Sequence, residues 1–151
     1  MLKGISPLLN AEVLFALRAM GHGDDLIIAD TNFPADSVAR QTRLGKLLRI
    51  DNVTAAEAAA AVLSVYPIDT FVDDAAARME IVGKPAEVPP VQEEVQQVLD
   101  AAEGKSTPMM SIERFAFYER AKQAYCVIQT GERRFYGCFA FRKGVIPPDE
   151  G

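Results

Sequence analysis

The apolar run Leu26–Ala29 constrains the fold more than any other stretch of the chain. It reads Leu-Ile-Ile-Ala without a polar interruption, and Asp24 and Asp25, both expected to be solvated, precede it. A strand whose side chains are all apolar must be covered on both faces, which is typical of a central strand in a layered α/β domain. Asp30 follows at its carboxyl end, the edge at which open α/β sheets bind ligands.

The rest of the chain alternates helix and strand patterns. Helical spacing, N-caps at Asn10 and Thr54 and a closing glycine at Gly104 predict helices over residues 10–20, 54–65, 91–103 and most of 111–123. Short apolar runs predict further strands at residues 47–50, 79–82, 125–128 and 135–141. This alternation predicts one three-layer α/β domain with a mixed sheet, spanning residues 1–151.

The last two predicted strands are expected to pair as a hairpin. The segment Thr130–Arg133 between them carries the turn pattern Thr-Gly-Glu-Arg. In a hairpin, Cys126 and Cys138 could lie near one another across the two strands. We expect thiols rather than a disulfide, because a reducing compartment is the predicted environment.

Alternation along the second of these strands makes a separate prediction about its two faces. Tyr136, Cys138 and Ala140 would point to one side of the sheet, and Phe135, Phe139 and Phe141 would mostly point to the other, apart from any local bulge near Gly137.

Composition and charge argue against several classes of function. The formal net charge is -5 and no block of like charges occurs, so the basic surface of a nucleic-acid-binding protein is missing. No apolar run has the length of a membrane span, and the first seven residues lack the apolar core of a signal peptide. We therefore expect a cytoplasmic protein. One histidine, two cysteines and no Cys-x-x-Cys leave no strong metal-binding pattern.

His22 is the first candidate for chemistry, because it is the only histidine in the chain. It lies between Gly21 and Gly23, just past a predicted helix, where flanking glycines permit close approach of a ligand. A histidine side chain with a typical pKa of ~6.5 is the natural proton carrier near neutral pH. The alternative is a structural role, in which His22 is solvated in the turn or caps the preceding helix. Taken on its own, the residue slightly favours this structural role.

Three further positions have both a binding and a structural interpretation. Asp30 could accept hydroxyl groups of a sugar or tune the histidine, or it could cap the turn that follows its strand. Arg114 and Tyr118 are four residues apart and share a helix face, which could bind a ligand or form intrahelical pairs with glutamates. Tyr136 with Gly137 could belong to a site or to a strand bulge.

Several blocks of sequence, taken together, resemble one protein family. They are Lys3–Leu9, Met20–Asp24, Asp30 with Asn32–Pro34, Arg114–Ala121, Thr130–Glu132, Tyr136-Gly137 and Arg142–Val145. This combination resembles the RbsD/FucU family of sugar mutarotases, most closely its L-fucose mutarotase branch. The resemblance spans nearly the whole chain and is weakest between about residues 69 and 108.

The resemblance implies an RbsD-like fold and an isomerase that interconverts the α and β anomers of a free monosaccharide. It implies no cofactor, no metal, and a cytosolic homo-oligomer, typically a ring, with sites at or near subunit interfaces. His22 would be the catalytic proton donor. The sugar-binding residues would be Asp30, Arg114, Tyr118, Tyr136, Gly137 and Cys138.

One position departs from the family pattern. The family usually has Tyr-Gly-Asn where this chain has Tyr136-Gly137-Cys138. An asparagine amide donates and accepts hydrogen bonds, whereas a thiol does both weakly. Position 138 therefore either binds through its backbone or reflects a different sugar preference. A ribose pyranase, a mutarotase for another sugar and a non-catalytic sugar-binding oligomer are the alternatives.

Overall fold

The apolar run at residues 26–29 forms most of β1 (Asp25–Ala29), near the middle of a six-stranded sheet. The computed structural model describes all residues, 1–151. The strand order is β2-β5-β1-β6-β3-β4. The other strands are β2 (Leu48–Ile50), β3 (Ala76–Met79), β4 (Met110–Ile112), β5 (Cys126–Thr130) and β6 (Phe139–Arg142). Only β6 runs against the others, since it pairs antiparallel with both β1 and β3.

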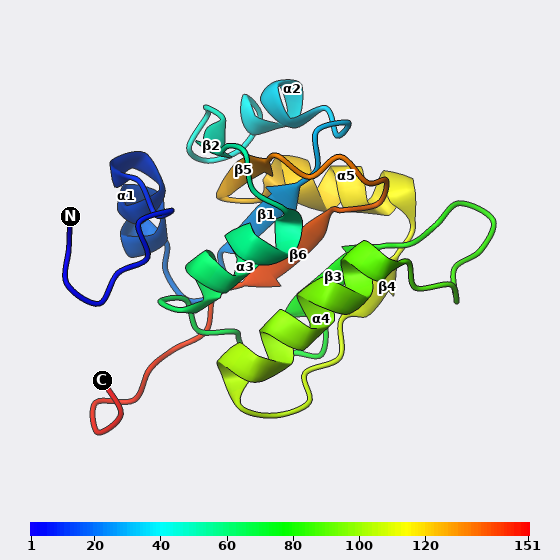
Figure 1. The fold of residues 1–151 in the computed structure, drawn as a ribbon. Helices are drawn as coiled ribbons and strands as arrows, with labels where there is room; N and C mark the ends of the chain where they lie inside the picture. Colours follow the sequence, from blue (N-terminus) through cyan, green and yellow to red (C-terminus); the bar gives the residue numbers. More distant parts are fainter.

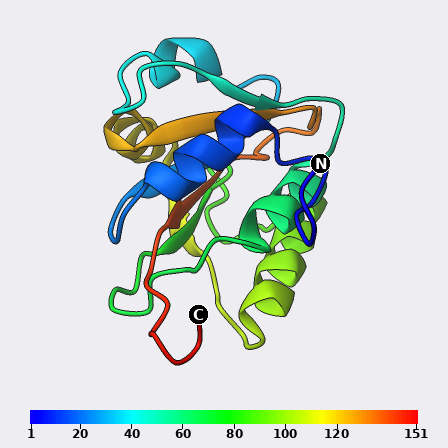
Figure 2. The same cartoon turned by 90° about the vertical axis from the view of Figure 1, so that its left-hand side faces the viewer.

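Five helices cover the two faces of this sheet (Figure 1). One hydrophobic cluster joins the sheet to α1 (Ala11–Ala19), α3 (Ala55–Leu63) and α4 (Pro90–Glu103). A second cluster joins the opposite face to α2 (Ala35–Ala39) and α5 (Arg114–Gln123). Figure 2 shows the sheet between these helices from the side of α1. The predicted three-layer α/β domain with a mixed sheet is confirmed.

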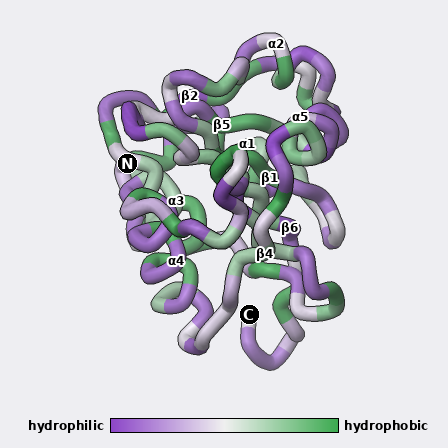
Figure 3. The backbone as a smooth tube through the Cα atoms, turned by 90° about the vertical axis from the view of Figure 1, so that its right-hand side faces the viewer, coloured by the Kyte–Doolittle hydropathy of each residue, from purple (hydrophilic) through white to green (hydrophobic).

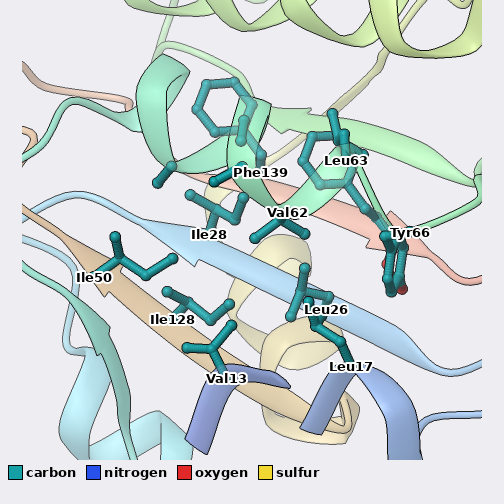
Figure 4. Close-up of a cluster of buried hydrophobic side chains, with 14 of the residues drawn as sticks. Val13, Leu17, Leu26, Ile28, Ile50, Val62, Leu63, Tyr66, Ile128 and Phe139 are labelled. Carbon is teal, nitrogen blue, oxygen red and sulfur yellow. The ribbon is translucent and has the colours of Figure 1, made fainter. Parts of the chain in front are cut away.

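The side chains of β1 alternate between the two clusters. Leu26 and Ile28 pack with the first cluster, which Figure 4 shows around Val62 of α3, while Ile27 packs with the second. All three are fully buried, and burying a Leu or Ile side chain contributes roughly 1.5–3 kcal/mol. The tube in Figure 3 is accordingly green mainly in the centre, near β5, and largely purple around the outside. No helix combines the length and apolar character needed to cross a bilayer.

The predicted helix ends rest on identifiable hydrogen bonds. The Asn10 side chain accepts from the Val13 backbone N–H at 3.0 Å, which starts α1. Thr54 and Glu57 form a complete capping box at the start of α3. Gly104 adopts a left-handed conformation (φ 70°) and ends α4.

The predicted hairpin is wrong, because β1 lies between β5 and β6. β5 pairs parallel with β1, and the segment 131–138 crosses to the other side of β1 before β6 begins. Cys126 therefore pairs with Leu26 at the amino end of β1. Cys138, which directly precedes β6, lies near the carboxyl end of β1. Both cysteines are buried and free. Two apolar strands with a turn pattern between them carry no local mark of a third strand inserted between them.

Two further strand predictions need comment. The strand expected at residues 79–82 lies earlier, at β3, whose two alanines have a low strand propensity that hid it from the pattern. The predicted faces of the last strand are confirmed for residues 138–141, because Cys138 and Ala140 pack in one cluster and Phe139 and Phe141 in the other. The strand itself begins only at Phe139, and the prediction for Phe135 is wrong, because Phe135 is exposed and lines the same pocket as Tyr136 and Cys138.

Candidate functional site

A pocket of about 210 Å³ lies at the carboxyl end of β1. Its walls come from the turn after β1, the end of β3, the first turns of α5 and the loop before β6. The lining residues are Asp30, Asn32, Phe33, Met79, Arg114, Tyr118, Phe135, Tyr136 and Cys138. Five of the predicted sugar-binding residues thus meet in one pocket, at the sheet edge where ligands bind in α/β folds.

Asp30 organises one wall of this pocket. Its side chain is 3% exposed, and Oδ1 accepts the backbone N–H groups of Asn32 and Phe33, each at 2.9 Å. Oδ2 accepts the Gly137 N–H at 3.0 Å and the Cys138 thiol at 3.5 Å. The carboxylate therefore caps its own turn and ties that turn to the start of β6. Gly137, the sixth predicted residue, is part of this wall through its backbone.

Arg114 lines the pocket and carries a buried hydrogen-bond donor that has no partner. Its buried Nε has no hydrogen-bond partner, and no carboxylate forms an ion pair with its guanidinium. The intrahelical pair between Arg114 and a glutamate, which the sequence allowed, is therefore not formed. The Glu113 carboxylate fixes the start of α5 by accepting the Phe115 and Ala116 N–H groups, which holds Arg114 at the first turn of the helix. A buried donor without a partner is costly, so a ligand oxygen that accepts from it gains binding free energy.

Tyr136 is held in an unusual backbone conformation beside Cys138. Its φ of 63° lies in the left-handed region, which is uncommon for a residue other than glycine. The fully buried Gln92 of α4 donates from Nε2 to the carbonyl oxygens of Tyr136 at 3.0 Å and Met79 at 2.7 Å. Its Oε1 accepts from Arg78 at 2.9 Å. Gln92 therefore supports the pocket from behind, a role that nothing in the sequence pattern signalled.

Glu132 holds the same loop through a second set of hydrogen bonds. Its side chain is 3% exposed and accepts from the Arg134 guanidinium and from the N–H groups of Arg134 and Ala55. Its carbonyl oxygen accepts the Thr31 N–H at 2.8 Å, which joins the loop to the turn after β1. The Arg134 hydrogen bond is the main reason that the pKa of Glu132 falls to about 2. The block Thr130–Glu132 belonged to the family pattern, but only the structure connects it to the pocket.

Cys138 is a poor nucleophile in this environment. Burial raises the pKa of its thiol well above the usual value, and the nearby Asp30 carboxylate adds to the effect. The thiol therefore stays protonated near neutral pH and acts as a weak donor to Asp30. Its carbonyl oxygen accepts the Met79 N–H at 3.1 Å. No group of three or more His, Cys, Asp and Glu side chains could hold a metal ion.

His22 lies at the other end of β1, outside this pocket. Its side chain is 44% exposed, and its Nε2 is 3.2 Å from Oδ1 of Asp69. The Phe71 ring packs edge-on against the imidazole, with centroids 5.4 Å apart. Asp25 and Asp30 alone are about 16 Å apart along the strand at about 3.3 Å per residue, and His22 precedes both. One copy of the chain therefore cannot bring His22 and Asp30 to the same monosaccharide.

The charges beside this end of β1 differ from the sequence expectation. Asp25 was expected to be solvated, but its side chain is largely buried between two arginines. Arg120 of α5 binds both carboxylate oxygens at 3.0 and 3.1 Å, and Arg142 of β6 binds them at 3.2 Å. The register of β1 beside β6 places Asp25 opposite Arg142, which local sequence does not reveal.

Comparisons with known proteins agree on one family. The sequence model of the RbsD / FucU transport protein family matches residues 3–146. Fucose mutarotase of Homo sapiens is 43% identical, with 96% of this chain and 94% of that protein covered. Fucose mutarotase of Danio rerio is 42% identical, with 99% and 97% covered. The crystal structure of the Streptococcus pneumoniae fucose mutarotase in complex with L-fucose superimposes with a TM-score of 0.86 at 32% identity, covering 97% of this chain and all of that one.

Proposed function

We propose that this protein, which belongs to the RbsD/FucU family, is a cytoplasmic mutarotase that interconverts the α and β anomers of L-fucose. The observation that carries the proposal is the near full-length similarity to proteins named fucose mutarotase, at 42–43% identity. The pocket at the carboxyl end of β1 fits it, because a small hollow with an unused Arg114 donor suits a sugar hydroxyl or ring oxygen.

The chemistry requires proton transfer and little else. Mutarotation opens the hemiacetal ring and closes it again on the other face of the aldehyde. The ring oxygen gains a proton while the anomeric hydroxyl loses one, and a histidine can serve as the proton carrier near neutral pH. In this proposal His22 carries the proton. Arg114 and the hydroxyl groups of Tyr118 and Tyr136 orient the sugar.

The proposal requires a second copy of the chain, because His22 and the pocket lie at opposite ends of β1. Exposed apolar side chains accompany both: Phe71 lies beside His22, and Phe115 and Phe135 lie at or near the pocket. An interface that joins two different surfaces of the same chain is head-to-tail, and such interfaces close into rings when the rotation permits. A ring in which His22 of one copy reaches the pocket of the next would complete every site.

Anomeric exchange measured by saturation-transfer NMR tests the activity. L-fucose, ribose and galactose are compared, because Cys138 in place of the family asparagine leaves the preferred sugar open. We expect the fastest enzyme-dependent exchange with L-fucose. Faster exchange with ribose would favour a pyranase, and binding without any exchange would favour a sugar-binding oligomer.

Mixing two inactive variants tests the shared site. His22→Ala and Arg114→Ala each damage a different half of it, so in a mixed ring some interfaces would combine the intact halves. Random reassembly of equal amounts should recover about a quarter of the sites, because each interface draws its two halves independently. The control is the same mixture without a dissociation and reassembly step. No recovery from mixed rings would contradict the head-to-tail site.

A further inference from the structure

We infer that the hollow beside Arg78 is a second binding site, which takes a small monocarboxylate with a short apolar chain. This Arg78 hollow has a volume of about 410 Å³, and Gln92, Val88 and Met109 are among the residues that line it. It shares no lining residue with the pocket at the carboxyl end of β1. The site therefore goes beyond the proposed function and does not depend on it.

Arg78 is an unusual residue for the strand that carries it. β3 reads Ala-Ala-Arg-Met, and all four residues are buried. Ala77 and Met79 pack in the cluster with α2 and α5, so alternation directs Arg78 to the other face of the sheet. There Gln92 of α4 accepts from its Nη1 at 2.9 Å. A buried charge of this kind is costly unless an opposite charge or enough hydrogen bonds compensate it.

The chain gives the Arg78 guanidinium neutral acceptors alone. Nη1 donates to the Gln92 amide oxygen, and Nη2 donates to the Pro85 carbonyl oxygen at 3.3 Å. A guanidinium has five N–H groups, so more than half of its donors have no acceptor in the chain. Arg78 forms no ion pair, and the Glu80 carboxylate accepts from the Ser111 hydroxyl at 2.6 Å instead.

An oxyanion in the Arg78 hollow would supply what the cation lacks. Burial lowers the pKa of the Arg78 guanidinium, while the Glu80 carboxylate acts in the opposite direction from longer range. An arginine nevertheless stays protonated, so its positive charge is present at neutral pH. A bound carboxylate would accept the free N–H groups and neutralise this charge, and such charge-assisted hydrogen bonds are the strong ones.

The remaining walls of the Arg78 hollow indicate which oxyanion fits. The Gln96 amide is already used, since it donates to the Thr107 carbonyl oxygen at 2.7 Å and accepts the Met109 N–H at 2.9 Å. Arg78 is therefore the charged donor of the site. The side chains of Val88 and Met109 offer an apolar surface beside it. A carboxylate head on Arg78 with a short alkyl chain on this surface matches both parts.

Negative charge at the rim favours one charge over two. Glu93 lines the Arg78 hollow, is exposed, and has no side-chain hydrogen bond or ion pair. Like charges repel, so Glu93 opposes a phosphate dianion more strongly than a monocarboxylate. Butyrate is accordingly a suitable probe, because it combines one carboxylate with three carbons of apolar chain.

Methyl NMR of the assembled protein, labelled at the methionine methyl groups, tests the site directly. Met109 reports on the Arg78 hollow and Met79 on the sugar pocket, and Met109→Leu assigns the first signal. Butyrate should shift the Met109 signal with saturation in the millimolar range. No saturable shift of Met109, or a shift of Met79 without Met109, would overturn the inference.

Two further ligands test the chemical class. Butyramide has the same apolar chain without the charge and should bind about tenfold more weakly or less, since it loses the charge-assisted hydrogen bonds. Inorganic phosphate should also bind more weakly than butyrate. Equal binding of butyramide, or tighter binding of phosphate, would refute a monocarboxylate site.

Substitutions of Arg78 test the donor. Arg78→Leu should weaken butyrate binding about tenfold or more, whereas Arg78→Lys keeps the charge and should retain part of the affinity. Thermal unfolding of both variants checks that the fold is intact. Undiminished binding in a folded Arg78→Leu protein would overturn the inference.

Glu93→Gln decides the matter even if Arg78→Leu does not fold, because this exposed side chain has no hydrogen bond or ion pair to lose. Removing its negative charge should strengthen butyrate binding about twofold at low salt. Glu150→Gln is the matched control, since it changes the net charge equally but lies in the exposed C-terminal tail outside the Arg78 hollow. Equal affinities of the two variants would refute a carboxylate bound beside Glu93.

Discussion

Replacing Glu132 by glutamine should destabilise the protein and loosen the pocket together. The Glu132 side chain joins two parts of the chain: the loop before β6 through Arg134, and the first residue of α3 through the Ala55 N–H. Its backbone carbonyl also accepts from Thr31 in the turn after β1, and glutamine keeps that bond. Glutamine keeps one oxygen acceptor but loses the charge that holds Arg134. The loop that carries Tyr136 should then become more mobile, and the KM for sugar should rise.

The size of the stability loss follows from the pKa of the Glu132 carboxyl. Its fall from 4.5 to about 2 corresponds to about 3.4 kcal/mol of stabilisation, at about 1.36 kcal/mol per pKa unit. Arg134, its main partner, is 42% exposed, and solvent screening reduces the value of a half-exposed pair. We therefore expect Glu132→Gln to lower the free energy of unfolding by about 1–3 kcal/mol at pH 7.

The direction of the pKa shift determines how this stabilisation depends on pH. A carboxyl whose folded pKa is depressed stabilises the protein fully above its unfolded pKa, and this contribution is lost as the pH falls through the folded value. The difference between wild type and Glu132→Gln should be constant from pH 7 to about pH 5 and shrink between about pH 4.5 and 2. Urea unfolding at a series of pH values, followed by circular dichroism, measures it.

Glu94→Gln is the matched control for this prediction. Glu94 also binds the Arg134 guanidinium, at 2.7 and 2.9 Å, but its side chain is half exposed and has no contact with Ala55 or Thr31. Its replacement should cost less than about 1 kcal/mol, as is usual for surface ion pairs. A pH-independent loss in Glu132→Gln, or equal losses in both variants, would refute the reasoning.

Three further variants probe the pocket. Arg114→Lys should raise KM about tenfold or more with little change in melting temperature, because lysine lacks the Nε donor; an unchanged KM in the exchange assay would remove Arg114 from the site. Cys138→Asn should preserve or raise exchange of L-fucose, since an amide N–H can donate to Asp30 Oδ2 more strongly than the thiol; a complete loss would assign the thiol a specific role. Gln92→Leu should lower the free energy of unfolding by about 2–4 kcal/mol in urea titrations, because Nη1 of Arg78 and the Tyr136 carbonyl each lose the hydrogen bond to Gln92; a loss below 1 kcal/mol would contradict this.

Short-range patterns predicted those parts of the fold that local chemistry determines. The helix caps at Asn10 and Thr54, the buried strand at residues 26–29 and the left-handed Gly104 each depend on neighbours within a few residues, and each was predicted. Strand order depends on contacts between distant segments. The insertion of β1 between β5 and β6 therefore could not be read from the turn pattern at residues 130–133, and the expected hairpin was wrong.

The same distinction applies to the candidate site, where the pocket could be predicted from local sequence and its supporting residues could not. The pocket could be anticipated, because Asp30 ends a buried parallel strand and the carboxyl edge of such a sheet is where ligand-binding groups gather. Glu132 and Gln92 support the pocket by hydrogen bonds to backbone groups of other segments. No sequence pattern predicted this role, because a residue type with a charge or an amide is usually exposed, and the sequence does not show that these two are buried.

The proposed role of His22 depends on the assembly of copies, in addition to the sequence and the fold of one copy. Its place at the amino end of β1 follows from the chain, and its contact with Asp69 at 3.2 Å follows from the fold of one copy. Under the proposed function, its meeting with the sugar depends on how copies assemble, because the length of β1 separates it from the pocket. A mutarotase built this way would lose activity on dissociation even though every subunit stayed folded. Dilution of the oligomer, with circular dichroism and anomeric exchange measured on the same samples, would separate folding from catalysis, and exchange that persists in folded monomers would exclude a site shared between copies.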